Sequence, residues 1–293
     1  MTAVSAGPSV RWAAGPFRFE LTSDDPPVRA LASAIFRPWA TTEANEPTRS
    51  WQIDRVNATM ADPEWRVRSS VGVETRVSSP ERAVGAVEFA AVNAIVESPG
   101  IIAHGALVAR DGRGILLVGR GEAGKSTLAC ALWTRGAALL GDDVTLLDPA
   151  SGDARPAPRR VSLRSASREL LGESLFARIL QGPSSVARAD ACLFHPEEIE
   201  PHPRPVSARL AAIVFLTRRG GASAAARPEP LAPAHALMAL LPYTNLRAGT
   251  SLGEAIRRLA PLADRVPAFD LGRGPLAEMA TVVEGLAGAA RPT

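Results

Sequence analysis

The amino-acid sequence predicts an α/β fold for its last two thirds, and three observations support this prediction. An apolar run at 114–118 leads into a glycine-rich loop, and a helical segment that extends to Arg135 follows the loop. Residues 210–216 are uniformly apolar, as a buried strand is. Helical patterns recur at 234–241, 251–263 and 275–287. A strand, a loop, a helix and another strand in this order begin an α/β domain.

The region before about Ser98 differs and is predicted to be an α+β accessory or recognition subdomain. Its strand-like segments alternate apolar and polar residues, and its helical segments space apolar residues three and four apart. These segments lie at 17–21, 28–36, 65–68 and 83–96, and Val71, Val73 and Val77 continue the strand pattern. No catalytic combination of residues occurs here. Residues 1–98 are therefore assigned to the accessory subdomain and 99–293 to the catalytic domain.

Further segments complete the predicted α/β domain in chain order. Strands are expected at 101–109, 137–140, 144–147, 159–164 and 266–271, and a short helix at 165–171. Residues 181–208, with several prolines and serines, are typical of an exposed loop. Residues 218–233, rich in glycine, alanine and proline, are typical of a mobile connection.

The composition is that of a soluble globular chain, with 293 residues, 46% hydrophobic and 22% charged. The N-terminus lacks the basic and apolar segments of a secretory signal, and no apolar run approaches the roughly 18 residues that span a bilayer. Cys130 and Cys192 are too few for a disulfide framework or a four-cysteine zinc site, and both are expected to be buried. The sequence therefore predicts a cytoplasmic protein without a membrane partner.

The charge of the chain is modest and scattered. The 33 cationic and 30 acidic residues give a net charge of +3, and no cluster of five or six consecutive cations occurs. Nucleic-acid-binding proteins concentrate their cations and interleave aromatic residues, so no nucleic-acid partner is predicted. Lys125 is the single lysine among the cations. Lysine is a compact charge on a flexible stem, a role that arginine fills poorly, so its position requires an explanation.

Residues 119–126, Gly-Arg-Gly-Glu-Ala-Gly-Lys-Ser, fit the Walker A (P-loop) pattern G-x-x-x-x-G-K-[ST] without a mismatch. Glycines let backbone N–H groups converge on phosphate oxygens at a helix N-terminus, which favours anions. In this pattern Lys125 reaches the β- and γ-phosphates and the Ser126 hydroxyl holds Mg²⁺. The alternative, a glycine-rich turn that binds nothing, does not account for the position between a strand and a helix.

The loop is therefore predicted to bind a nucleotide together with Mg²⁺. The residues expected to form the binding site are Gly119, Arg120, Gly121, Glu122, Ala123, Gly124, Lys125, Ser126 and Thr127. A negative charge at Glu122 opposes phosphate. Because the backbone forms the cradle, the Glu122 side chain is expected to point outward.

Asp142 and Asp143 form an adjacent pair between two apolar runs. Two acids in such surroundings are costly to bury unless a metal or hydrogen-bond donors satisfy them. A Mg²⁺ held by Ser126 is one such partner, and the second acid would accept a proton from an attacking hydroxyl. The alternative is a polar turn between two strands. The nearby phosphate loop favours the functional interpretation.

The four histidines carry a weaker signal. His104 lies in an apolar strand pattern and precedes Gly105, and a lone histidine there is more often a core residue than a catalytic one. His195, His202 and His235 lie near prolines and loops without metal-ligand spacing. These three are expected at the surface.

Taken together, His104-Gly105, the loop 119–127 and the stretch 135–143 (Arg-Gly-Ala-Ala-Leu-Leu-Gly-Asp-Asp) resemble the catalytic core of HPr kinase/phosphorylase. More closely, they resemble the HPr-kinase-related kinases associated with peptide-modifying gene clusters. In that family a His-Gly pair begins a strand before the phosphate loop, and a stretch ending in two acids follows the helix. The resemblance implies a P-loop kinase core, of the fold that HPr kinase shares with phosphoenolpyruvate carboxykinase, which uses ATP and Mg²⁺.

The resemblance also implies roles for individual residues. Asp142 would be the base that takes the hydroxyl proton, and Asp143 together with Ser126 would hold the metal. His104 would contact phosphate or orient an aspartate, and Lys125 would stabilise the phosphates during transfer. The family tends to self-associate, so a homo-oligomer is a further expectation.

The sequence also departs from the family. The Glu-Ile-Arg-Gly-type signature of HPr kinase/phosphorylase is not found downstream, and Thr127 stands where that enzyme often has an acid. HPr as acceptor and the reverse, phosphorolytic reaction are therefore not implied. Arg159, Arg160 and Arg164 are either contacts to phosphate or acceptor, or ordinary surface arginines.

Three functional hypotheses follow. The favoured one is an ATP- and Mg²⁺-dependent kinase that transfers the γ-phosphoryl group to a hydroxyl, with a serine of a protein or peptide as acceptor. The second is a small-molecule kinase with the same phosphate machinery. The third is a nucleotide-sensing regulatory module that binds without turnover.

Overall fold

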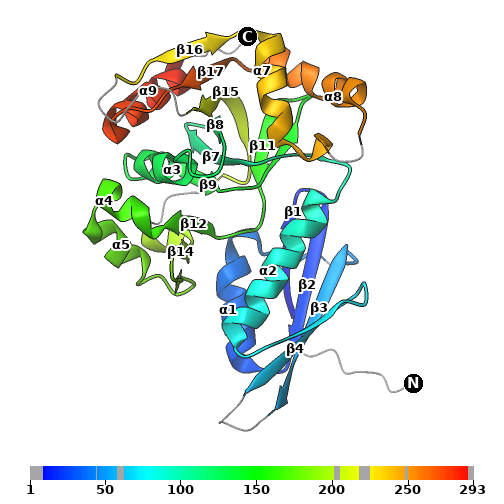
Figure 1. Cartoon of the computed structure of the whole chain (residues 1–293). Helices are drawn as coiled ribbons and strands as arrows, with labels where there is room; N and C mark the ends of the chain where they lie inside the picture. Colours follow the sequence, from blue (N-terminus) through cyan, green and yellow to red (C-terminus); the bar gives the residue numbers. More distant parts are fainter. Residues whose placement is uncertain are drawn as a thin grey trace. The chain divides into compact units, whose positions relative to one another are not determined.

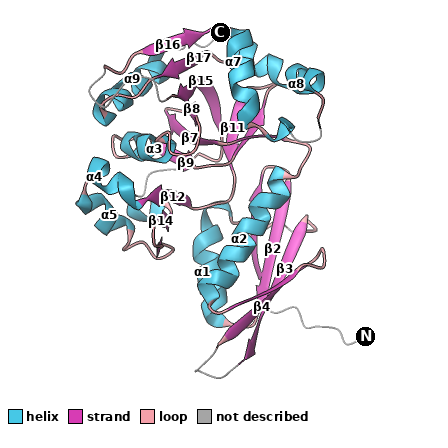
Figure 2. Ribbon diagram, viewed as in Figure 1, coloured by secondary structure: helices cyan, strands magenta, loops and turns pink. Residues whose placement is uncertain are grey.

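The computed structural model describes residues 9–43, 45–57, 63–200, 205–217, 225–247 and 250–289. His202, residues 218–224 and the first residues of the chain, on which sequence predictions fall, lie outside these ranges. The chain divides into two compact units, Met1–Ser98 and Pro99–Thr293. Helices and strands are mixed in both, so the fold is a mixed α/β one, as predicted (Figures 1 and 2).

The first unit is built on a five-stranded sheet in the order β1-β2-β3-β4-β5. The strands are β1 (Ser9–Ala14), β2 (Phe17–Ser23), β3 (Arg49–Asn57), β4 (Glu64–Ser69) and β5 (Glu74–Val77). β2 and β3 are parallel and the other neighbours antiparallel. The parallel pair is connected through helix α1 (Pro26–Phe36) and the short η1 (Arg37–Trp39), and α2 (Pro80–Val96) follows β5.

Alternation along the strands divides this sheet into an apolar and a polar face. Trp12, Phe19 and Trp51 are buried, whereas Arg11 on β1 forms an ion pair with Glu20 on β2 at 2.8 Å. Both helices begin at a capping residue whose side chain accepts a hydrogen bond from the first turn, Asp25 for α1 and Ser79 for α2. The alternation ends earlier than predicted, because Val71 and Val73 lie exposed in the turn between β4 and β5.

The core of the first unit is aromatic. The rings of Trp12 and Phe36 stack with centroids 3.8 Å apart, and Phe19 and Trp51 lie within about 6 Å of Trp12. Phe36, at the end of α1, therefore attaches that helix to the strands. Such a cluster supplies much of the apolar area that a unit of this size buries.

The second unit contains the larger sheet. Within the described residues its nine strands run β6-β10-β11-β15-β8-β7-β9, and β17 pairs with β15 and with β16. The strands are β6 (Ile101–Ala103), β7 (Gly105–Arg110), β8 (Arg113–Val118), β9 (Ala138–Gly141), β10 (Thr145–Asp148), β11 (Asp153–Pro156), β15 (Ala208–Leu216), β16 (Pro228–Leu231) and β17 (Ala268–Leu271). The central strands β15, β8 and β17 include parallel pairs, and β7 and β9 extend the sheet in antiparallel fashion.

Helices cover both faces of this sheet. Leu117 of β8 and Val214 of β15 belong to a core that contains α3 (Lys125–Trp133) and α9 (Leu276–Ala289). The residues just before them, Leu116 and Ile213, point to the other face and belong to a second core with α7 (Pro233–Leu240) and α8 (Leu252–Arg265). Both faces of β15 are buried from Leu210 to Leu216, which explains why this stretch is uniformly apolar, and the predicted buried strand at 210–216 is confirmed.

A small three-stranded sheet, in the order β12-β14-β13, lies against the first of these cores. It consists of β12 (Val161–Arg164), β13 (Val186–Ala187) and β14 (Ala191–Phe194). Short helices accompany it: η2 (Ser165–Ser167), α4 (Arg168–Leu171), α5 (Glu173–Ile179) and α6 (Pro196–Ile199). The chain also forms η3 (Leu241–Tyr243) and η4 (Asn245–Arg247) between α7 and α8.

Several sequence predictions for this unit are wrong. Residues 181–208 are not one exposed loop, because Phe194 packs against Trp133 and orders β14, with ring centroids 5.9 Å apart. His195, expected at the surface, is 1% exposed, whereas His235 is exposed as predicted. The predicted strand 101–109 is two strands, broken at His104. The connection at 218–233 contains β16.

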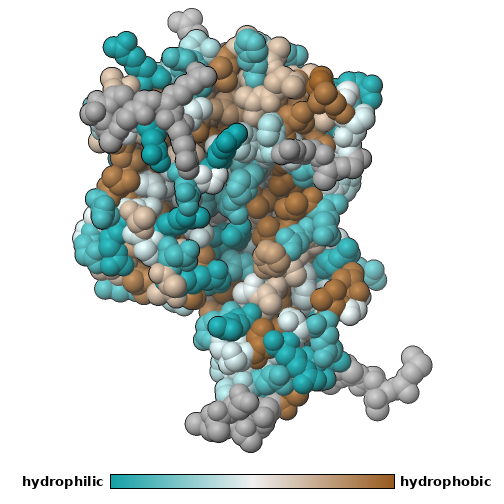
Figure 3. Space-filling view, viewed as in Figure 1, coloured by the Kyte–Doolittle hydropathy of each residue, from teal (hydrophilic) through white to brown (hydrophobic). Residues whose placement is uncertain are grey.

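Other features of the surface and core agree with the sequence. Cys130 and Cys192 are free and buried, as predicted. None of the helices in the described part of the chain combines the length and the apolar character needed to cross a bilayer. On the face shown in Figure 3, polar residues are interspersed among apolar ones over both units.

The aromatic core of the first unit provides a stability test. We expect Phe36→Ala to lower the free energy of unfolding by about 3–5 kcal/mol, because it removes a buried ring and leaves a cavity beside Trp12. Urea denaturation followed by tryptophan fluorescence measures this. Trp12, Trp39, Trp51 and Trp65 all lie in the first unit.

Phe89→Ala is the matched control. Phe89 lies on α2 in the same unit but is 67% exposed, so its removal is expected to change the free energy of unfolding by less than about 0.5 kcal/mol. Equal effects of the two substitutions would contradict the described packing.

Candidate active site

The glycine loop, residues 119–124, connects the end of β8 to the first turn of α3. Gly124 precedes the helix with φ of 95°, in the left-handed region that glycine adopts without strain. At Gly119 the backbone passes so close to β15 that an added Cβ would lie 2.8 Å from the carbonyl oxygen of Leu216. The first N–H groups of α3 have no acceptor within the helix, so this end of α3 favours an anion.

Lys125 begins α3 and turns back across the loop. Its Nζ donates to the carbonyl oxygens of Gly119, at 2.8 Å, and Arg120, at 3.3 Å. The residue is only 8% exposed. Burial lowers the pKa of this ammonium group below its usual value, and the charges of Asp142 and Asp143 oppose the shift. The loop therefore holds a cation whose solvation by water has been replaced by two carbonyl groups.

Asp142 lies directly beside Ser126. The Ser126 Oγ is 2.9 and 3.1 Å from the two carboxylate oxygens, and the backbone N–H of Ser162 donates to Oδ2 at 3.3 Å. Asp142 is 5% exposed. Burial raises its pKa, the hydrogen bond from Ser126 opposes this, and the charge of Asp143 adds to it. Ser126 and Ser162 donate to this buried carboxylate through neutral groups, which leaves its charge available to a cation.

Asp143 points to different partners from its neighbour, because its φ of 74° turns the backbone sharply. Its Oδ1 lies 2.9 Å from His104 Nδ1, and its Oδ2 is paired with Arg159. Burial alone would raise the pKa of Asp143. The hydrogen bond from His104 and the charge of Arg159 outweigh burial and lower the pKa to about 2. Asp143 is therefore ionised at neutral pH.

His104 is positioned by the break between β6 and β7. Its backbone N–H donates to the carbonyl oxygen of Tyr243 at 2.6 Å, and the N–H of Gly105 donates to the carbonyl oxygen of Asp143 at 3.2 Å. A Cβ at Gly105 would lie 2.7 Å from the carbonyl oxygen of Leu117, so only glycine fits beside β8. The His-Gly pair thus places the imidazole at the end of β7 next to the second acid.

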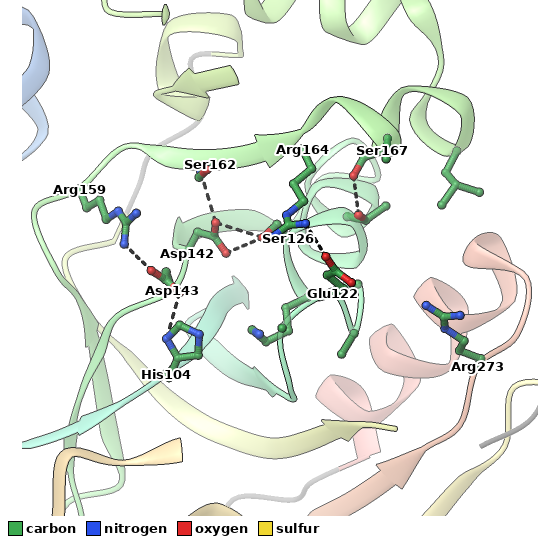
Figure 4. Close-up of a pocket in the computed structure, with 17 residues that line it drawn as sticks. His104, Glu122, Ser126, Asp142, Asp143, Arg159, Ser162, Arg164, Ser167 and Arg273 are labelled. Atoms are coloured by element: carbon green, nitrogen blue, oxygen red, sulfur yellow. Dashed lines mark hydrogen bonds and ion pairs between the residues drawn. The ribbon is translucent and has the colours of Figure 1, made fainter. Parts of the chain in front are cut away.

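The segment from β12 to α4 closes the site from the other side. Arg164 on β12 forms an ion pair with Glu122 of the glycine loop at 2.7 Å. Ser167 on η2 is hydrogen-bonded to Thr127 on α3 at 2.7 Å between the hydroxyl oxygens. Figure 4 shows both contacts, together with the Asp142 and Asp143 contacts, arranged around a common space.

This space is a cavity of about 560 Å³, within the size range of small-molecule sites. It is lined by His104, Gly121, Glu122, Ala123, Gly124, Lys125, Ser126, Thr127, Asp142, Asp143, Arg159, Ser162, Arg164, Ala166, Ser167, Leu170 and Arg273. Nearly all of the residues singled out from the sequence therefore lie together. Gly119 and Arg120 are not in the lining and contribute the carbonyl groups that hold Lys125.

Other lining residues carry no usable sequence signal. The sequence leaves open whether Arg159 and Arg164 belong to a site or to the ordinary surface, and in the structure both line the cavity. Arg160 lies elsewhere, buried with its guanidinium donating to the carbonyl oxygen of Ser184 at 2.9 Å. Leu170 and Arg273 come from segments far along the chain and belong to no recognised motif.

No protein-family model matches the chain, and no curated protein matches it in sequence. Among solved structures, the chain is similar to the Hpr(Ser) kinase/phosphatase from Coxiella burnetii, with 14% sequence identity over 64% of this chain and 93% of that chain. The TM-score is 0.33, which is too low to add weight to any functional argument.

The close approach at Gly119 yields a stability prediction. Gly119→Ala forces a Cβ against the backbone of β15, which cannot move as a side chain can, so we expect a loss of about 1–3 kcal/mol in the free energy of unfolding. Differential scanning calorimetry measures it as a lower Tm of the second unit.

Gly121→Ala is the matched control in the same loop. No heavy atom lies within 4 Å of a Cβ at Gly121, and its φ is not in the left-handed region. We expect its Tm to stay within about a degree of the wild type. If Gly119→Ala were equally neutral, the described packing of the loop against β15 would be wrong.

Proposed function

We propose that the chain is a kinase that binds ATP and Mg²⁺ at the glycine loop and transfers the γ-phosphoryl group to a hydroxyl. One observation carries this proposal: a loop of Walker A sequence at a helix N-terminus shares a single cavity with two acidic residues and a histidine. Phosphoryl transfer requires a cradle for the phosphates, a cation to bind their charge and a group that receives the acceptor's proton. The cavity offers residues suited to all three.

The phosphate cradle comes from the glycine loop and the start of α3. The free N–H groups of the first helical turn favour the negative phosphates, and Lys125 lies across the loop. We propose that its ammonium group exchanges the carbonyl oxygens of Gly119 and Arg120 for the β- and γ-phosphate oxygens. The Lys125 side chain is long enough to reach these phosphate oxygens, because it already contacts the loop that would surround the phosphates.

The residues that would hold Mg²⁺ are Ser126 and Asp142. A hydroxyl and a buried carboxylate in contact are the oxygen ligands that this ion prefers, and phosphate oxygens and water complete its shell. Among the described residues no cluster of three or more His, Cys, Asp or Glu side chains forms a metal site. Bound Mg²⁺ would neutralise charge on the phosphates.

The contacts favour an exchange of the two aspartate roles relative to those expected from the sequence. The sequence resemblance implies that Asp142 is the base and Asp143 a metal ligand. In the structure, however, Asp142 is the acid that contacts Ser126. Asp143 is bound to His104, whose Nδ1–H fixes the ring and leaves Nε2 as the basic nitrogen. We propose that Asp143 and His104 together orient the acceptor hydroxyl and take its proton.

The acceptor is proposed to be a serine of a protein or peptide. This part of the proposal rests on the motif resemblance to HPr-kinase-related kinases, through His104-Gly105, the glycine loop and the stretch that ends in Asp142 and Asp143. The side of the cavity that contains His104 and Asp143 is where the attacking hydroxyl would have to lie.

Phosphoryl transfer tests the proposal directly. The full chain is incubated with γ-³²P-labelled ATP, Mg²⁺ and a library of serine-containing peptides, with a parallel library in which alanine replaces serine. We expect label only on serine peptides. Asp143→Asn is expected to lower the transfer rate about a hundredfold or more, because it removes the carboxylate that orients His104 and keeps Nε2 free to take the proton. Asp142→Asn is expected to raise the Mg²⁺ concentration for half-maximal rate about tenfold.

Asp190→Asn, an exposed carboxylate outside the cavity, is the matched control and should transfer at the wild-type rate. If the chain binds ATP but transfers phosphate to no acceptor, kinase activity is contradicted. The nucleotide-sensing regulatory module would then be the favoured function. Transfer that survives Asp143→Asn unchanged would contradict the proposed role of Asp143 in proton transfer together with His104.

A further inference from the structure

The cavity has two chemically different ends. His104, Asp143 and Arg159 are joined by ion pairs at one end, and Figure 4 shows Arg273 on the opposite side of the glycine loop from His104. The acidic end is suited to the acceptor and its proton. The end with Arg273 has no role in the chemistry proposed above.

Leu170 lines this cavity while 64% of the side chain is exposed. It lies in α4, three residues after Ser167, so both occupy the same side of the helical turn. Ser167 is hydrogen-bonded to Thr127, the residue that follows the Walker A serine. The apolar side chain is therefore held near the start of α3, away from the acidic end. Leu170 is the largest apolar side chain in the lining of this cavity, so it offers the apolar surface on which a flat ring could pack.

Arg273 approaches from a different element. It lies between β17 and α9, in the short segment Gly-Arg-Gly-Pro at 272–275. β17 is paired with β15, and α9 packs against α3, so the segment has well-anchored ends. The other two arginines of the cavity, Arg159 and Arg164, each bind a carboxylate. The Arg273 guanidinium has no hydrogen bond or ion pair with any described residue, although it lines the cavity.

The direction of the nucleotide follows from the proposed function. The γ-phosphate must lie near Asp143 and His104, and Lys125 contacts the β- and γ-phosphates. The α-phosphate and the nucleoside then extend away from the acidic end, past Thr127. That path leads toward the region of the cavity that Leu170 and Arg273 line.

We propose that Leu170 and Arg273 form a clamp for the base of the nucleotide, an inference that rests on the proposed function. A heteroaromatic base has two flat apolar faces. An aliphatic side chain packs on such a face, and a planar guanidinium stacks on it while keeping its edge in water. These two residues, from α4 and from the segment before α9, supply one surface of each kind. The other apolar side chains that line the cavity are the small Ala123 and Ala166, and its other two guanidinium groups are paired with carboxylates.

Isothermal titration calorimetry on the full chain tests the clamp with two ligands, ATP and inorganic tripolyphosphate, both with Mg²⁺. Tripolyphosphate carries the phosphates but no base. We expect Leu170→Ala and Arg273→Ala each to weaken ATP binding about tenfold, the scale of losing one stacking contact. Tripolyphosphate binding is expected to stay within about twofold of the wild type.

Leu252→Ala and Arg188→Ala are the matched controls, since both residues are exposed and outside the cavity, and neither should alter ATP binding. Unchanged ATP affinity in both clamp variants would overturn the clamp but leave the proposed function intact. Equal weakening of ATP and tripolyphosphate by Arg273→Ala would also overturn it and assign this residue to the phosphates. A wild-type chain that binds neither ligand would overturn the proposed function itself.

Discussion

The site depends on one hydrogen bond, between the Ser126 hydroxyl on α3 and the buried carboxylate of Asp142. The two residues are brought together by the sheet. β9 delivers Asp142 and pairs with β7, β7 pairs with β8, and β8 leads into the glycine loop and α3. A carboxylate that is 5% exposed costs several kcal/mol to bury unless donors satisfy it. The neutral groups around Asp142 meet part of that cost, and a cation shared with phosphates would meet the rest.

A sharp turn at Asp143 directs the side chains of two adjacent acids to different partners. Its positive φ directs the side chain away from Ser126 and toward His104 and Arg159, whose charge and hydrogen bonds keep it ionised. The first acid therefore faces the glycine loop and α3, and the second faces the side of the cavity where we propose that the acceptor binds. The break at His104 between β6 and β7 serves the same geometry, since a continuous strand would not turn the imidazole to this acid.

The predictable parts of the molecule are those that local chemistry determines. The loop at 119–126 follows from steric and electrostatic requirements within eight consecutive residues, and Asp142 stands out because acids are costly among apolar residues. The predicted surface position of His195 is wrong, because its burial depends on the packing of β14 against a core whose other residues are distant in sequence. Leu170 and Arg273 gave no signal at all, because what distinguishes them is a shared cavity between segments about a hundred residues apart in sequence. Such long-range placement leaves no periodicity or spacing to detect.

A double-mutant cycle on Ser126→Ala and Asp142→Asn tests the central claim, that these two side chains act as one unit in binding nucleotide with Mg²⁺. The dissociation constant of ATP is measured by calorimetry, at saturating Mg²⁺, for the wild type, both single variants and the double variant. We predict that the double variant binds ATP no more weakly than the weaker-binding single variant, with a coupling energy of about 1–3 kcal/mol. If the losses of ATP-binding free energy in the two single variants add up in the double variant, the two residues act independently. That result would contradict the central claim.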